Sequence, residues 1–134
     1  MKRESWLPAA PESAPLARAI VREAAVQHGL DGEPAWDLML ATTEAVANAI
    51  LHGGACENGD GRGILLRVLP CPDGLCVEVC DCGRFDSELV PPARDATSGR
   101  GIPIIAAVVD QLAIVPDACQ TRVRFGKRRV SVAA

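Results

Sequence analysis

The chain has 134 residues, a length typical of one domain, and 49% of them are hydrophobic, which supports a filled core and argues against disorder. Its formal net charge of −3 argues against general nucleic-acid binding, which usually needs a basic face. No apolar run approaches the roughly 20 residues that span a bilayer, and the N-terminus lacks a signal-peptide core. These features predict a cytoplasmic protein that contacts neither nucleic acid nor membrane, with its six cysteines as reduced thiols.

Periodicity and turn residues predict three helices and five strands. Ser13 is expected to cap the first helix, and Pro72-Asp73-Gly74 to form a hairpin turn. The basic residues 127–129 are expected to be a solvated strand end. The strands are expected at 4–10, 64–69, 75–80, 111–115 and 121–128, and the helices at 13–29, 32–54 and 102–110. This order predicts an α+β two-layer sandwich, with a mixed, mostly antiparallel sheet and three helices on one face.

Three polar residues interrupt an apolar helical run between Leu38 and Gly54, LMLATTEAVANAILHGG. Glu44, Asn48 and His52 are four residues apart, so they lie on neighbouring turns of one helix face. Polar groups on a buried helix need partners, and a magnesium ion carrying a phosphate is one such partner. Asn48 offers an oxygen ligand, and Glu44 is placed to act as a general base. The alternatives are a solvated helix face and, for His52, a structural role at the helix end.

An aspartate followed by a glycine ends the second strand of the predicted hairpin, VEVCDCG. Asp81 can accept a hydrogen bond from an exocyclic amine such as that of adenine. Gly83 lacks a side chain where the backbone would approach a flat ring. The alternative is a plain turn that ends the strand.

A third box, SGRGIP, leads directly into the last predicted helix. Gly99 and Gly101 leave backbone N–H groups and the positive end of the helix dipole facing any anion. Arg100 adds a charge that suits phosphate. A Gly-x-Gly pattern alone is weak evidence, but its position after the other two boxes favours a nucleotide site.

The cysteines cluster without the paired CxxC spacing of a zinc site. Cys76, Cys80 and Cys82 fall on one face of a predicted strand, where cysteine behaves as a small buried hydrophobe. Metal binding or redox sensing is the alternative.

In this order, the three boxes resemble the N-box and the two glycine boxes of the Bergerat-fold (GHKL) ATP-binding superfamily, which includes gyrase, Hsp90, histidine kinases and MutL. The short length and the segments TTEAVANAILHG and GRGIPII resemble the anti-sigma factor serine-protein kinases, which regulate bacterial stress and sporulation sigma factors. The resemblance covers almost the whole chain. It implies one histidine-kinase-like ATP-binding domain over residues 1–134, with no room for a kinase's sensor or dimerisation domains.

The resemblance also implies roles for individual positions. Glu44 would be the catalytic base that activates a serine of a partner protein. Asn48 would bind Mg2+, and Asp81 would bind adenine, with Thr121 near it. The other nucleotide-binding positions would be His52, Gly83, Gly99, Arg100 and Gly101.

The function implied is an ATP- and Mg2+-dependent anti-sigma regulator. It would bind a sigma factor and phosphorylate a serine of a STAS-type anti-anti-sigma protein, and the family often forms homodimers. The sequence departs from the family pattern where Arg84 and Phe85 follow Gly83, since a second glycine is usual there, and where Gln120 replaces the glycine before Thr121. The alternative is therefore a non-catalytic, nucleotide-binding module that sequesters its partner.

Overall fold

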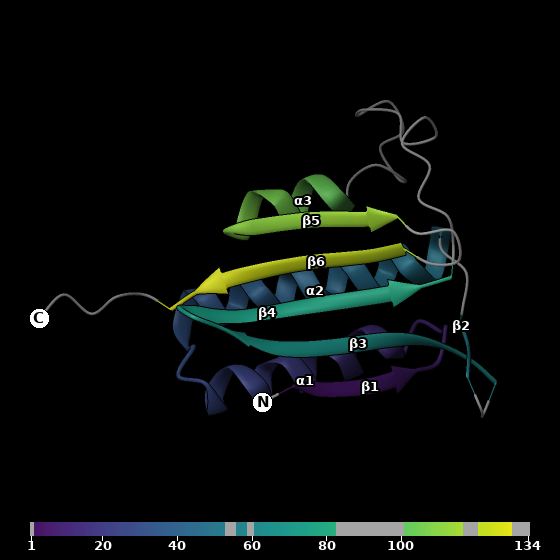
Figure 1. Cartoon of the computed structure of the whole chain (residues 1–134), viewed down its shortest axis with the longest axis horizontal. Coiled ribbons are helices and arrows are strands. Elements are labelled where there is room, and N and C mark those ends of the chain that lie inside the picture. The colour runs from purple at the N-terminus through teal and green to yellow at the C-terminus, as the bar shows by residue number, and fades with distance from the viewer. Residues whose placement is uncertain (1, 53–55, 59–60, 83–100, 117–120, 130–134) are drawn as a thin grey trace, which may run out of the picture.

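The computed structural model describes residues 2–52, 56–58, 61–82, 101–116 and 121–129 (Figure 1). These residues form three helices and one six-stranded sheet. In chain order the elements are β1 (Arg3–Leu7), α1 (Ser13–Gln27), α2 (Gly32–His52), β2 (Cys56–Asn58), β3 (Gly61–Cys71), β4 (Gly74–Asp81), α3 (Gly101–Val108), β5 (Gln111–Pro116) and β6 (Thr121–Arg128).

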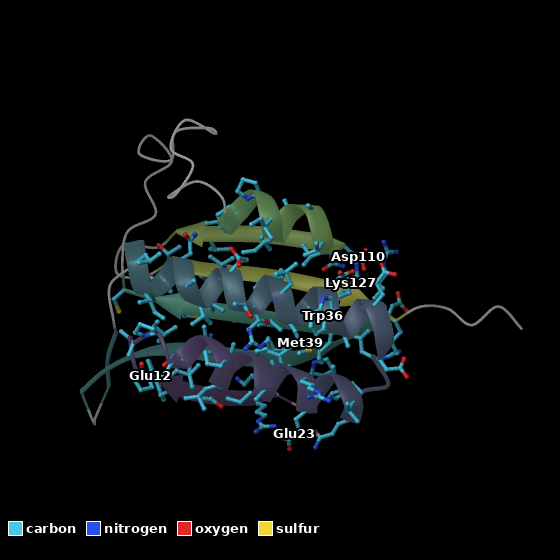
Figure 2. The ribbon with its side chains drawn as sticks, turned by 180° about the vertical axis from the view of Figure 1, so that it is seen from behind. Glu12, Glu23, Trp36, Met39, Asp110 and Lys127 are labelled. Atoms are coloured by element: carbon cyan, nitrogen blue, oxygen red, sulfur yellow. A yellow bond between two sulfur atoms is a disulfide. The ribbon has the colours of Figure 1, made fainter. Side chains whose placement is uncertain are left out.

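The sheet has the strand order β1-β3-β4-β6-β5, with β2 paired to β3 off this path. The three helices lie on one face, behind the strands in Figure 1 and in front of them in Figure 2. This confirms the predicted α+β sandwich. Every pairing among the described strands is antiparallel, so the expectation of a mixed sheet was too broad.

Strand β4 lies in the middle of the sheet, and all its residues are buried. Side chains alternate between the faces of a strand, so odd and even positions of β4 face opposite ways. Val77 and Val79 belong to the hydrophobic core under the helices. Cys76 and Cys80 are equally buried but lie outside that core, on the face without helices. Asp81 continues the odd-numbered series and therefore lies on the helix-covered side.

Helix α1 begins where it was predicted, but its cap is different. The N-cap residue is Glu12, which makes no side-chain capping bond. The buried hydroxyl of Ser13 instead donates a hydrogen bond to the Pro8 carbonyl, tying the helix start to the segment after β1. Ser13 is thus a helical residue rather than the cap, because Pro8 gives its hydroxyl a partner outside the helix.

Strand β2 was not predicted. The residues around Glu57 and Asn58 are polar and flanked by glycines, which indicated a flexible connection. In the structure Cys56–Asn58 pair antiparallel with Gly61–Gly63, so β2 and the extended start of β3 form a short hairpin. Backbone pairing between two short segments does not need an apolar alternation, which is why the pattern missed it.

The prediction of six reduced thiols was wrong. Cys71 and Cys76 form a disulfide across the β3–β4 hairpin, with their Cα atoms 6.1 Å apart. Pairing of Cys71 with Gly74, and of Leu69 with Cys76, makes the two cysteines diagonal neighbours on one face of the sheet. Cys82 is also disulfide-bonded. Cys80 is a free, buried thiol, as its predicted role as a small hydrophobe requires, and burial raises its pKa to about 11.

We expect the Cys71–Cys76 bond to stabilise the fold modestly, because the loop that it closes is short. The double variant Cys71→Ala/Cys76→Ala should unfold with a free energy about 2 kcal/mol lower than that of the wild type in denaturant titrations. Under a reducing agent the two proteins should differ little, which controls for the cost of the substitutions. Equal stabilities without reductant would show that the disulfide does not contribute.

Candidate functional site

Two predicted site residues meet at one end of the central strands. Asp81 is the last residue of β4 and Thr121 the first of β6, and they are direct partners in the antiparallel register. Both are buried, with relative exposures of 6% and 4%. Both also lie on the helix-covered side, since Val79 and Val123 two residues away belong to the core. A carboxylate and a hydroxyl therefore stand side by side beneath the helical layer.

The predicted polar stripe of α2 faces the helix that follows the glycine box. Asp37 fixes the orientation, because its carboxylate contacts Lys127 of β6. Glu44 and Asn48 are seven and eleven residues further along, so each lies within about 20° of Asp37 around the helix axis. Both are half-buried. The stripe is thus on the side of α2 that looks toward β6 and α3, as nucleotide contact there would require.

Lys127 links three elements at the base of this region. Its Nζ lies 3.0 Å from Asp37 Oδ2 of α2 and donates a 2.7 Å hydrogen bond to the Val108 carbonyl of α3. The side chains of Lys127 and Asp37 are each only 18% exposed, and Lys127 is labelled in Figure 2. The expectation of a solvated basic strand end was wrong for Lys127, because the packed helices bring an acceptor from each side to its ammonium group.

Several predicted positions lie outside what the structure describes. Gly101 is the first residue of α3, which places the third box at the amino end of a helix as expected. Gly83, Gly99 and Arg100 lie outside the described residues. His52 is the last residue of α2, and its side chain is not described.

The side chains near the stripe suit a metal ion that is held jointly by the protein and a phosphate ligand better than one held by protein side chains alone. Within the described residues, no three His, Cys, Asp or Glu side chains gather in a way that would hold a metal ion. Magnesium in nucleotide sites commonly takes one or two protein oxygens, with phosphates and waters completing the octahedron. A half-buried amide oxygen at Asn48 fits that requirement.

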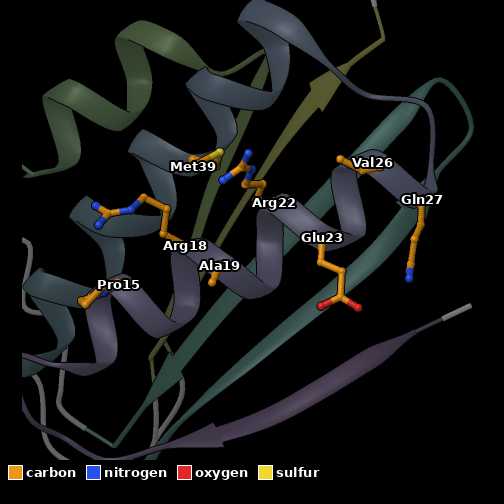
Figure 3. A pocket seen from close by; sticks show the side chains of 8 residues that line it. All are labelled: Pro15, Arg18, Ala19, Arg22, Glu23, Val26, Gln27 and Met39. Atoms are coloured by element: carbon orange, nitrogen blue, oxygen red, sulfur yellow. The ribbon is translucent and has the colours of Figure 1, made fainter.

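A surface hollow of about 590 Å3 lies elsewhere, between α1 and α2 (Figure 3). Arg18, Arg22 and Met39 are among its lining residues, and the Arg18 guanidinium donates a 3.4 Å hydrogen bond to Thr43 Oγ1. Met39 is five residues before Glu44, which places the two about 140° apart around α2. The hollow is therefore distinct from the site formed by the stripe.

Residues 7–127 match the model of the histidine kinase-like ATPase domain. The chain belongs to this family. The match runs from the end of β1 to the end of β6, so it contains Asp81, Thr121 and the α2 stripe. No curated protein sequence matches the chain.

One solved structure with the same fold holds the RsbU and RsbW domains of Rv1364c from Mycobacterium tuberculosis. The two chains are 24% identical, with a TM-score of 0.72. The alignment covers 96% of this chain and 32% of the other, so this chain spans about a third of that protein's length. Among the residues that the structure describes, no helix combines the length and hydropathy that a membrane span requires.

Sequence reasoning missed the contact between Asp37 and Lys127, because the two residues are far apart in the chain. The sequence nevertheless indicated that Asp37 lies on the same helix face as Glu44, since the two residues are two helical turns apart.

We expect Lys127→Met to lower the free energy of unfolding by about 2 kcal/mol. The substitution removes the ammonium group that contacts the mostly buried Asp37 carboxylate and the Val108 carbonyl. Arg128→Met is the matched control. Arg128 pairs with Asp110 on the surface, where its side chain is 65% exposed, so its loss should cost under about 0.5 kcal/mol. Thermal and urea unfolding measure both effects, and equal losses would contradict the assignment.

Proposed function

We propose that the chain binds ATP between α2, α3 and the ends of β4 and β6. The observation that carries this is the register pairing of buried Asp81 with buried Thr121 on the helix-covered side. A buried carboxylate at a strand end is suited to accept a hydrogen bond from the exocyclic amine of adenine, and the hydroxyl beside it can bond a ring nitrogen. Gly83 would let the backbone approach the ring.

The phosphates would lie toward the amino end of α3. Backbone N–H groups at Gly99 and Gly101 would face them, and Arg100 would add its positive charge. Asn48 would hold Mg2+ through its side-chain oxygen, and His52 would orient a phosphate at the end of α2. This proposal is supported by the family match, since histidine kinase-like ATPase domains bind a nucleotide.

The reaction that we propose is phosphoryl transfer to a serine. Glu44 accepts the proton of the serine hydroxyl while the serine oxygen forms a bond to the γ-phosphorus. The bond from that phosphorus to the bridging oxygen breaks, and ADP leaves. Magnesium, when bound, supplies neutralisation of the phosphate charge. The half-buried position of Glu44, one helical turn before Asn48, supports its role as base.

The biological role that we propose is that of a cytoplasmic anti-sigma regulator. As a single domain over residues 1–134, it would hold a sigma factor and phosphorylate a STAS-type anti-anti-sigma protein. The likeness to a structure that includes an RsbW domain supports the fold on which such a role would depend.

A second candidate is a module that binds nucleotide and sequesters its partner without phosphoryl transfer. One observation favours it. Arg84 and Phe85 follow Gly83, where a second glycine would let the backbone close over the phosphates.

Nucleotide binding should depend on Asp81. Mg-ATP at about a hundred times its dissociation constant should stabilise the wild type by about 2.7 kcal/mol, seen as a rise in Tm. Asp81→Asn should lose this shift, because the amide is uncharged and has one acceptor oxygen in place of the two of the carboxylate. The matched control is Asp73→Asn in the β3–β4 turn, at the other end of β4, which should keep the shift. A full shift in Asp81→Asn would refute the adenine assignment.

Phosphoryl transfer should depend on Glu44. Glu44→Ala should keep the thermal shift with Mg-ATP but lose labelling of a STAS-domain serine substrate by γ-labelled ATP. Glu33→Ala, an exposed acidic residue in the first turn of the same helix, should keep both activities. Undiminished transfer in Glu44→Ala would place the base elsewhere. Binding without transfer in the wild type would favour the non-catalytic module.

A further inference from the structure

Disulfide-bonded cysteines lie near both ends of strand β4, and they differ in exposure. Near its start Cys76, only 1% exposed, bonds the half-buried Cys71 across the β3–β4 hairpin. At its end Cys82, the residue after Asp81, is exposed and disulfide-bonded. The partner of Cys82 is neither of the hairpin cysteines, which bond each other, nor Cys80, whose thiol is free. The second bond therefore ties the end of β4 to another part of the chain.

The end of β4 has fewer neighbouring strands than its middle. In the described register the pairing of β4 with β3 ends at Cys80, so the position of Asp81 continues across the sheet into β6, through Thr121. Thr121 in turn pairs with Pro116 of β5, a residue that has no backbone N–H to donate. Strand ends with few neighbours open more readily than strand centres. The disulfide at Cys82 is thus a covalent restraint beside the carboxylate that the proposed function assigns to adenine.

We propose that Cys82 is a site of thiol–disulfide exchange with a dithiol reductant, and that opening its bond lowers the affinity of the chain for nucleotide. The inference rests on the proposed function, in which Asp81 binds adenine. With the bond closed, Asp81 is held beside Thr121 in the arrangement that binding requires. With the bond open, this arrangement is populated for only part of the time, and the apparent affinity falls by the same fraction. Dithiols are the class of reductant that keeps cytosolic cysteines reduced.

The exchange is a two-electron reduction of the disulfide. A thiolate of the dithiol attacks the Cys82 sulfur and forms a mixed disulfide, while the bond to the partner sulfur breaks and the partner leaves as a thiolate. The second thiolate of the reductant attacks the reductant's own first sulfur, and Cys82 leaves as a thiolate. The two protons that the dithiol loses are gained by the two protein thiolates, and the dithiol becomes a cyclic disulfide. The exposure of Cys82 admits the first attack, since exposed disulfides are the labile ones.

The free thiol of Cys80 lies two residues from Cys82 but does not compete in this exchange. Cys80 is 1% exposed, and burial raises its pKa to about 11. The thiol therefore stays protonated near neutral pH, whereas the species that attacks a disulfide is the thiolate. Rearrangement of the bond onto Cys80 is thereby disfavoured, so the bond of Cys82 can open and form again with the same partner.

Nucleotide affinity is best compared in the Cys71→Ala/Cys76→Ala background, which removes the hairpin bond. Calorimetric titration with Mg-ATP should give a dissociation constant about tenfold higher in reduced than in oxidised dithiothreitol. Cys82→Ser in the same background should bind weakly in both buffers, and urea unfolding checks that every sample is folded at the titration temperature. Binding that is equal in the two buffers, or tighter after reduction, would overturn the inference alone. Absence of binding in both buffers would overturn the ATP proposal as well.

A redox titration of the wild type needs no substitution and tests the exchange site itself. The chain is equilibrated in dithiothreitol buffers of graded potential, then alkylated, and the labelled cysteines are identified by peptide mass spectrometry. Cys82 should be labelled before Cys71 and Cys76, with or without nucleotide. Because the coupling is reciprocal, saturating Mg-ATP should lower the reduction potential of the Cys82 bond by about 30 mV, which corresponds to the tenfold change in affinity. Earlier labelling of the hairpin cysteines would refute the exchange site, and a potential unchanged by bound Mg-ATP would refute the coupling.

Discussion

The alternation of side chains along β4 is the constraint on which the rest of the structure depends. The strand is buried on both faces, so each of its residues belongs either to the helix-covered core or to the open face. Val77 and Val79 hold the helices, and the same parity carries Asp81 to the helical side at the end of the strand. A shift of register by one residue would turn this carboxylate to the other face and remove the core contacts together.

The arrangement of α2 and α3 depends on a second, local interaction. Lys127 comes from β6, which neighbours β4, and it contacts both helices through one ammonium group. This fixes the face that α2 turns toward α3, and so the direction in which Glu44 and Asn48 project. The sheet thus positions the site in two ways: β4 places Asp81 directly, and Lys127 of β6 orients the helix that carries Glu44 and Asn48. A glutamate on a helix needs such an anchor because rotation of the helix by a third of a turn would carry it away from the site.

Elements with strong periodicity could be predicted from the sequence, and the bounds expected for the last strand agree with those of β6. The nearness of Asp81 to Thr121 was implied only by the family resemblance, and their register pairing was not predicted, because no local pattern states which strands are neighbours. The contacts that were missed depend on how individual side chains are placed, and two of them join residues only five positions apart. Ser13 finds an acceptor in Pro8, Cys71 finds Cys76 across a hairpin, and Lys127 finds Asp37 from ninety positions along the chain. The short β2 lacked any apolar signal.

The hydrogen bond from Lys127 to the last turn of α3 has an electrostatic consequence for the opposite end of that helix. Aligned peptide dipoles give a helix about half a negative charge at its carboxyl end and half a positive charge at its amino end. The ammonium group beside the Val108 carbonyl offsets the negative end. What remains of the dipole is the positive end at Gly101, so a side chain of β6 strengthens the attraction of α3 for an anion more than ten ångströms away, without touching it.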